Sequence, residues 1–327
     1  MMQDSAAAVA ERYDRFAREE APGRSALYEE WARGVAGDPA VQAILSRVAA
    51  NHRQPPLVFA VTRMLGAPEG RYAAWARWVR THAHEVVTEC GGRSIQTNEP
   101  LRCAALLPAL SLVPGPIALL EIGASAGLCL YPDRYSYRYA GEEAALDPVD
   151  GVSDVVLHSV LRGSPELGMP HVIWRAGIDL SPLDAGDPDD RRFLTALVWP
   201  GEEGRVERIE AALDVVAADP PVLVAGDATD ETLLRNVAAR APAGATLVVT
   251  TPGVLPHIPR AGRDRLLTGI RALHARWITV DPVGLHDTWT ERVGSGFALA
   301  LDGRPLARVD PLGGSVEWLP EATVSAV

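Results

Sequence analysis

The sequence predicts an α/β fold, with a mostly parallel sheet, a C-terminal antiparallel hairpin and a preceding all-α segment. Residues 4–112 carry apolar side chains at helical spacing, interrupted by Pro and Gly. After residue 113, short apolar runs that end in acidic or small residues alternate with helical patterns, which is typical of parallel strands. The last two runs, 296–301 and 306–309, are joined by a short turn, which favours antiparallel pairing.

The helical segment is expected to form a domain of its own. Its apolar residues recur three or four positions apart, for example over residues 72–86. His82 and His84 lie in one predicted helix but on different faces, which argues against a metal pair. We predict a helical N-terminal cap domain at residues 1–112 and an α/β domain at residues 113–327, with the cap closing over the ligand edge of the sheet.

The stretch IALLEIGASAGLCL, residues 117–130, is the centre of the predicted α/β domain. An apolar strand ends at Glu121, the small-residue turn Gly123–Gly127 follows, and a helix is predicted to start at Leu128. Because the turn lacks large side chains, backbone N–H groups and the positive end of the helix can approach a ligand. The stretch therefore predicts a ligand site.

Three interpretations of this turn stay open. It can be a cofactor loop or a structural turn without a ligand. It can also be a nucleophile elbow, since GASAG satisfies Gly-x-Ser-x-Gly and is followed by Asp227 and then by His257 or His286. An elbow needs several strands before it, where this sequence has helices. A dinucleotide fingerprint does not fit, because it would need glycine at Ser125 and a small residue at Leu128.

Composition argues against several classes of function. The 327 residues have a formal charge of −11, and all 31 basic residues are arginine, so no lysine is present for a Schiff base or a Gly-Lys-Ser/Thr phosphate loop. The negative charge disfavours a nucleic-acid partner. No membrane-length apolar run or apolar leader is present, which predicts a cytoplasmic protein. The three cysteines form no Cys-x-x-Cys pair. We expect a small-molecule substrate and no metal.

The segment SIQTNEPLR carries more hydrogen-bonding groups than a helix start needs. Thr97 or Asn98 can cap a helix over residues 102–110. The segment also comes directly before the central strand. We expect four of its side chains to line the ligand site: Gln96, Asn98, Glu99 and Arg102.

The segments SIQTNEPLRCAALLPAL, LLEIGASAGLCL, WRAGIDLSPLD, LVWPGEEGRVERIEAAL and VLVAGDATD resemble landmarks of a bacterial family, the domain-of-unknown-function family 2332. The resemblance covers residues 12–318. That family resembles class I S-adenosylmethionine-dependent methyltransferases, which implies a Rossmann-like class I methyltransferase fold. The spacing Glu121-x-Gly123-x-Ser125-x-Gly127 likewise resembles the first methyltransferase motif, acidic-x-Gly-x-Gly-x-Gly, with serine at the middle glycine.

The resemblance implies further cofactor contacts. Asp179, at the end of a predicted strand, would accept from the ribose hydroxyls. Asp227 and Ala228, after the next strand, would hold the adenine amino group, although Asp227 could also cap the helix over residues 231–240.

The identity of the ribose acid depends on the second strand. More than 40 residues separate Gly127 from Asp179, where the fold needs about one helix. Residues 131–170 are therefore expected to be an insertion with extra strands. In the alternative, residues 135–140 are the second strand, and Glu142 or Glu143 takes the ribose role.

Two places depart from the family pattern. After the strand over residues 245–251 the family favours a histidine and a tyrosine, whereas this chain has the apolar run Val254-Leu-Pro256. This leaves Thr250 and Thr251 as the hydroxyl donors that we expect in the pocket. Near the end, Asp310-Pro-Leu-Gly313 stands where the family tends to have Pro-His-Gly. The remaining candidates for a catalytic base are His257, His286 and Glu99.

The sequence therefore predicts S-adenosylmethionine-dependent methyl transfer to a small molecule, in keeping with an enzyme of specialised metabolism. One alternative is a methyltransferase-like scaffold that catalyses elimination or cyclisation, or that serves as a subunit of a biosynthetic complex. Another is a serine hydrolase that uses Ser125. A homo-oligomer or a small partner protein is compatible with each of these.

Overall fold

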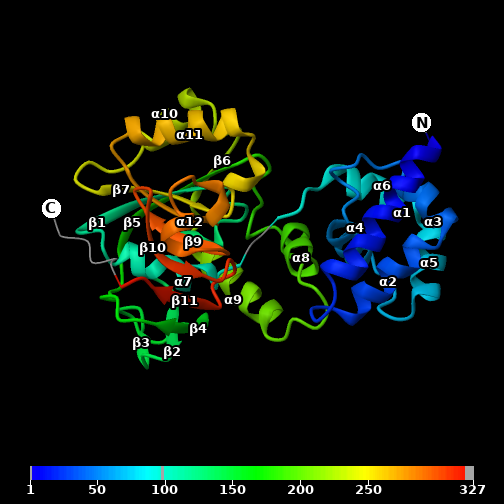
Figure 1. Ribbon diagram of the computed structural model, residues 1–327, viewed down its shortest axis with the longest axis horizontal. Helices are drawn as coiled ribbons and strands as arrows, with labels where there is room; N and C mark the ends of the chain where they lie inside the picture. The colour runs from blue at the N-terminus through cyan, green and yellow to red at the C-terminus, as the bar shows by residue number, and fades with distance from the viewer. Residues whose placement is uncertain (1, 97–98, 321–327) are drawn as a thin grey trace. The chain divides into compact units, whose positions relative to one another are not determined.

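The computed structural model describes residues 2–96 and 99–320 of the chain. Contacts divide the chain into two compact units: a helical unit of residues 1–97 and 187–210, and an α/β unit of residues 98–186 and 211–327. Figure 1 shows both, coloured along the chain. The segment 187–210 thus belongs to the helical unit, although in sequence it lies between strands of the α/β unit.

The helices of the helical unit, within the described residues, are α1 (Met2–Glu19), α2 (Ala26–Ala36), α3 (Pro39–Leu45), α4 (Pro55–Met64), α5 (Tyr72–Thr81), α6 (Ala83–Gly92) and α8 (Pro188–Ala196). Helix α9 (Arg205–Ala218) has residues in both units. None of the helices in the described part of the chain is both long and apolar enough to cross a membrane.

The helical unit is held together by an aromatic core. The rings of Phe16, Tyr28, Trp31, Phe59 and Trp75 lie with neighbouring centroids 4.8–6.2 Å apart. Aromatic pairs at such distances add about 0.5–1.5 kcal/mol each beyond the burial of their apolar area. The rings come from α1, α2, α4 and α5, so the helical spacing in the sequence does correspond to one buried core.

The single helical pattern over residues 72–86 is two helices. They meet at His82, whose ring stacks on Trp78 with centroids 4.1 Å apart. The Trp78 carbonyl oxygen accepts from the His82 backbone N–H at 3.0 Å and also lies 2.9 Å from His82 Nδ1. His84 therefore lies in α6, whereas His82 lies at the junction between α5 and α6.

The strands of the α/β unit are β1 (Pro116–Ile122), β2 (Ser136–Ala140), β3 (Ala144–Leu146), β4 (Val156–Arg162), β5 (His171–Asp179), β6 (Val222–Ala225), β7 (Thr246–Pro252), β8 (Arg276–Pro282), β9 (Phe297–Leu301), β10 (Arg304–Val309) and β11 (Ser315–Trp318). Its helices are α7 (Arg102–Leu110), α10 (Glu231–Ala238), α11 (Arg260–Ala272) and α12 (Thr290–Val293).

All these strands form one sheet in the order β3-β2-β4-β11-β10-β9-β8-β7-β1-β5-β6. The strands β6, β5, β1, β7 and β8 are parallel to one another. Strand β9 is antiparallel to β8 and forms a hairpin with β10. The prediction of an α/β fold with a mostly parallel sheet and a C-terminal antiparallel hairpin is confirmed.

The strand beside β1 is β5, and it is not the strand that comes next in sequence. β1 and β5 pair from Pro116 and His171 to Ile122 and Ile178, with one register shift after Ile117, whereas β2 lies nine places along the sheet from β6, next to β3 and β4. Of the two candidates for the second strand, residues 135–140 are therefore excluded, and with them the ribose role of Glu142 or Glu143.

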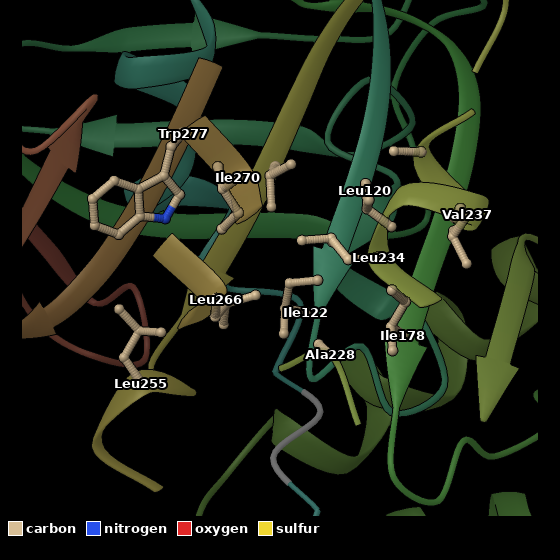
Figure 2. Close-up of a cluster of buried hydrophobic side chains, with 13 residues drawn as sticks. Leu120, Ile122, Ile178, Ala228, Leu234, Val237, Leu255, Leu266, Ile270 and Trp277 are labelled. Carbon is tan, nitrogen blue, oxygen red and sulfur yellow. The ribbon is translucent and has the colours of Figure 1, made fainter. Parts of the chain in front are cut away.

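A buried apolar cluster fills the face of the sheet that α10 and α11 cover (Figure 2). Leu120, Ile122 and Ile178 come from β1 and β5, and Leu234 and Leu266 come from the two helices. Because side chains alternate along a strand, Glu121 must point to the opposite face, away from this cluster.

Candidate functional site

The turn after β1 is folded tightly over β5. Its backbone has positive φ at Gly123 (74°), Ser125 (52°) and Gly127 (80°). Positive φ is ordinary for glycine but uncommon for serine, so the turn is locally strained at Ser125. The Gly123 N–H donates to the Ile178 carbonyl at 2.8 Å, which ties the start of the turn to β5.

No α-helix follows this turn, and the prediction of a helix starting at Leu128 is wrong. The chain makes one 3₁₀ turn, η1 (Leu128–Leu130), and leaves it at Tyr131 with φ −117° and ψ 42°. Pro132 explains the ending, because a proline disfavours the helical conformation of the residue before it. The turn therefore offers backbone N–H groups without a helix dipole behind them.

Asp179, at the end of β5, anchors the turn through a hydrogen bond. Its Oδ2 accepts from the Ser125 N–H at 2.8 Å, and its Oδ1 accepts from the Ser181 N–H at 2.8 Å. A carboxylate has about four lone pairs. Asp179, which is half-buried, can therefore still accept two hydrogen bonds from another molecule.

The acid after β6 is more exposed. Asp227 Oδ1 accepts from the Thr229 N–H at 2.8 Å. It does not cap α10, as the sequence allowed; the cap is Asp230, which accepts from Thr232 and Leu233 N–H groups. The reason is distance along the chain, since only Asp230 directly precedes the first helical residue. Ala228 is buried in the cluster of Figure 2, where its methyl group packs as a core residue.

Ser125 lacks two features of a nucleophile elbow. Its side chain is buried, with 2% of its surface exposed, and the turn is not followed by the helix that such an elbow precedes. A strained backbone is the feature that the turn at Ser125 shares with a nucleophile elbow.

A second group of residues lies around Arg102, at the start of α7. Its Nη1 donates to the Pro252 carbonyl at 3.0 Å, at the end of β7, and its Nε donates to the Pro311 carbonyl at 3.2 Å. Glu99 is buried and accepts from the Leu101 N–H at 3.0 Å through Oε1. Arg102 therefore joins the start of α7 to two distant segments.

Glu121 is buried close to this group. Only 3% of its surface is exposed, and among the described residues its Oε2 has no hydrogen-bond partner. Burial raises the pKa of Glu121 well above its usual range, Cys129 and Asp179 raise it further, and Arg102 lowers it. Buried carboxyls with raised pKa values are common at functional sites. Thr250, the partner of Glu121 in the β1–β7 register, is also buried.

Of the four expected pocket residues, Glu99 and Arg102 lie in this group. Asn98 and the alternative cap Thr97 lie outside the described residues. Gln96 belongs to the helical unit. The prediction that all four polar residues of the segment line one site therefore stays a prediction.

The ends of β7 and β8 carry a third group, on the face of the buried cluster. His286 Nε2 lies 3.0 Å from Asp281 Oδ2, and Thr279 Oγ1 donates to the same oxygen at 2.7 Å. Thr251 Oγ1 in turn donates to Thr279 Oγ1 at 2.7 Å. His257, by contrast, is exposed on η2 (Leu255–His257).

Sequence reasoning missed Asp281, although the signal was present. It is an acid at the end of a buried strand, the same pattern that marked Asp179 and Asp227, and it precedes His286 by five residues. All three acids lie at the carboxyl edge of one parallel sheet, where open α/β sheets bind their ligands.

A family model described as "Uncharacterized protein conserved in bacteria (DUF2332)" matches residues 10–318. The chain belongs to the DUF2332 family. Searched against curated proteins, the sequence gives no match. Membership confirms the resemblance found in the sequence and leaves the activity to be argued from the residues.

The two segments in which we expect departures from the family pattern both lie next to Arg102. One follows Pro252 and the other contains Pro311, the two residues whose carbonyls accept from its guanidinium. Gly313 passes so close to α7 that an added Cβ would overlap the Leu101 carbonyl. The fold thus brings three segments that are far apart in sequence to one place: the start of α7, the end of β7 and residues 311–313.

Proposed function

We propose that the α/β unit binds S-adenosylmethionine at the carboxyl ends of β1, β5 and β6 and transfers its methyl group to a small molecule. The order β6-β5-β1-β7-β8 supports the proposal. In chain order these are the third, second, first, fourth and fifth strands of the parallel core, the order of doubly wound nucleotide-binding sheets. The chain reverses direction across the sheet beside β1, and the small-residue turn lies at that switch point.

The donors and acceptors of the site suit a nucleoside. Ribose hydroxyls and an adenine amino group are donors, and the acids after β5 and β6 are acceptors. Asp179 keeps two lone pairs after bonding the turn, and Asp227 keeps Oδ2. An added Cβ at Gly123 would lie 2.8 Å from Val254 Cγ2, so only glycine fits between the turn and Val254.

An apolar hollow of about 350 Å³ adjoins the same turn. Its walls include Ala126, Leu183, Val216 and Leu223. Flat, mostly apolar groups with a polar rim are the usual occupants of such hollows. The hollow is therefore the place proposed for the base of the nucleoside.

When bound, S-adenosylmethionine supplies a methyl group on a sulfonium, whose carbon–sulfur bond breaks with its electron pair passing to sulfur. The residues of this chain then have to hold the acceptor in line with that bond. The turn and its anchor Asp179 would fix one reactant. The groups at the ends of β7 and β8 face the neighbouring position along the edge.

Calorimetric titration of the full chain with S-adenosylmethionine and S-adenosylhomocysteine tests the proposal. We expect micromolar binding, equivalent to about −8 kcal/mol, and its loss in Asp227→Ala and Asp179→Asn. The asparagine keeps an acceptor for the Ser125 N–H, so the turn stays anchored while the charge is removed. Asp230→Ala is the matched control: it removes a carboxylate three residues from Asp227 that caps α10, and it should bind normally.

Absence of binding at millimolar ligand would refute the proposal. The remaining interpretation would be a scaffold without methyl transfer. Equal loss in Asp230→Ala and Asp227→Ala would also count against it, because binding would then depend on α10 and not on the acid after β6.

A further inference from the structure

The end of β8 carries a buried carboxylate with one unsatisfied oxygen. Asp281 is 0% exposed. Its Oδ2 has two partners, Thr279 Oγ1 at 2.7 Å and His286 Nε2 at 3.0 Å. Its Oδ1 is buried and has no partner among the described residues. A buried carboxylate needs hydrogen-bond donors, and His286 is the one basic side chain within ion-pair distance of Asp281 in the described part of the chain.

A chain of hydrogen bonds fixes the direction of every donor that leads to Asp281. The Trp277 indole can only donate, and its Nε1–H bonds Thr251 Oγ1 at 2.9 Å. Thr251 Oγ1–H is then free to donate to Thr279 Oγ1 at 2.7 Å. Thr279 in turn donates to Asp281 at 2.7 Å, since its other acceptor, the Thr251 carbonyl, is farther away at 3.0 Å.

The direction of these hydrogen bonds determines the tautomer of His286. Because Asp281 Oδ2 is an acceptor, the Nε2 of His286 must carry the hydrogen that it shares with that oxygen. In the neutral ring the lone pair then lies on Nδ1. Trp289 stacks on the imidazole with centroids 3.8 Å apart and holds its plane. His286 is 17% exposed, so the free edge of the ring is open to a small molecule.

We propose that His286 Nδ1 is the proton acceptor for a small molecule that reacts through a hydroxyl group, and that Asp281 is its positioning residue. The substrate class rests on the proposed function. A carboxylate acceptor has already lost its proton at neutral pH and needs no base, whereas a phenol or alcohol, with a pKa of about 10 or more, does. A buried carboxylate behind the imidazole stabilises the imidazolium that forms.

The position of His286, after β8 at the edge of the sheet, suits a proton acceptor. Strand β8 is two strands from β1, which corresponds to about 10 Å at ordinary strand spacing. Val254, which adjoins Gly123, and Leu285, which precedes His286, pack against the same buried cluster. The turn and the imidazole therefore border the same part of the core, at the same edge of the sheet.

The step balances as a simple substitution. The acceptor oxygen would form a bond to the methyl carbon as the methyl–sulfur bond breaks with its electron pair passing to sulfur, while the O–H proton passes to His286 Nδ1. The imidazolium, held through Nε2 by Asp281, then returns that proton to water. No oxidant, reductant or metal takes part.

Two measurements on the full chain test the arrangement without a substrate. The first is a long-range ¹H–¹⁵N spectrum of the histidine-labelled protein at pH 8, assigned with His286→Ala. We expect a protonated Nε2 and an unprotonated Nδ1 for His286, and a shift toward the other tautomer in Asp281→Asn. Asp287→Asn, which alters an exposed neighbouring acid, should leave the spectrum unchanged.

The second measurement is the rate of acylation by diethyl pyrocarbonate, a reagent that reacts with an unprotonated imidazole nitrogen. We expect His286 to be modified, and to be modified more slowly in Asp281→Asn, while exposed His257 reacts equally in both proteins. A protonated Nδ1 in the wild type, an unmodified His286, or no response to Asp281→Asn would overturn the proposal. Calorimetry with S-adenosylmethionine reports independently on the proposed function, so each can fail without the other.

Discussion

Replacing Gly177 with alanine should lift the turn after β1 and destabilise the α/β unit. Gly177 pairs with Glu121 in the β1–β5 register, directly beneath the turn. An added Cβ would overlap the Cβ of Ala124 and lie 2.9 Å from Leu223 Cδ2. The Leu223 side chain can rotate away, but a Cβ atom moves only with its backbone, so the turn itself has to shift.

The expected loss has two parts. Overpacking a core typically costs about 1–3 kcal/mol, and contact with a backbone-attached carbon places this case at the upper end. A shifted turn also loses the bond from the Ser125 N–H to Asp179, and hydrogen bonds to charged groups contribute about 1.5–3 kcal/mol. The total is about 4.5–6 kcal/mol. With a urea m value of about 3 kcal/mol/M, the midpoint should fall by roughly 1.5–2 M.

Urea unfolding followed by circular dichroism measures this loss. Gly168→Ala is the matched control in the same unit, because an added Cβ there meets nothing within 4 Å. If the midpoint of Gly177→Ala falls no further than that of Gly168→Ala, the turn does not depend on close packing against β5, and our account of the site geometry is wrong.

Three further predictions concern other parts of the chain. Because burial raises the pKa of Glu121 above 4.5, the folded chain holds its proton more tightly, and this stabilisation is lost as the pH rises above that value. Glu121→Gln should therefore raise the urea midpoint at pH 8 but not at pH 4, and equal changes at both pH values would contradict this. Asp230→Ala should lower the free energy of unfolding by about 1 kcal/mol through loss of the α10 cap, while Asp227→Ala should change it by less. Burial raises the pKa of Cys90 to about 12, so a thiol reagent at pH 8 should leave this residue unlabelled until urea unfolds the chain; rapid labelling of the native protein would count against its burial.

The strands and helices could be predicted because their signals are local. An apolar run that ends in an acid located the carboxyl ends of β5 and β6, and helical spacing located the aromatic core of the helical unit. Pro132 was also a local signal, and it overrides the helix that Leu128 suggested.

The groupings of residues could not be predicted, because they depend on pairing between distant segments. Nothing near Arg102 in sequence indicates that it bonds the carbonyls of Pro252 and Pro311, about 150 and 209 residues away. The partner of His286 was five residues away and still missed, since only the extended β8 and the stacked Trp289 turn the ring toward Asp281.

The place of β11 in the sheet has a consequence for how the protein is made. Strand β11 lies between β4 and β10, so the last described strand of the chain joins strands formed from its first half to the hairpin. During synthesis, β4 is made about 150 residues before β11. Until β11 pairs with it, one edge of β4 stays open, and strands from other chains can add there. A nascent chain that stalls shortly before residue 315 would present two such edges, at β4 and β10. We therefore expect the pairing of β11 to decide between folding and aggregation.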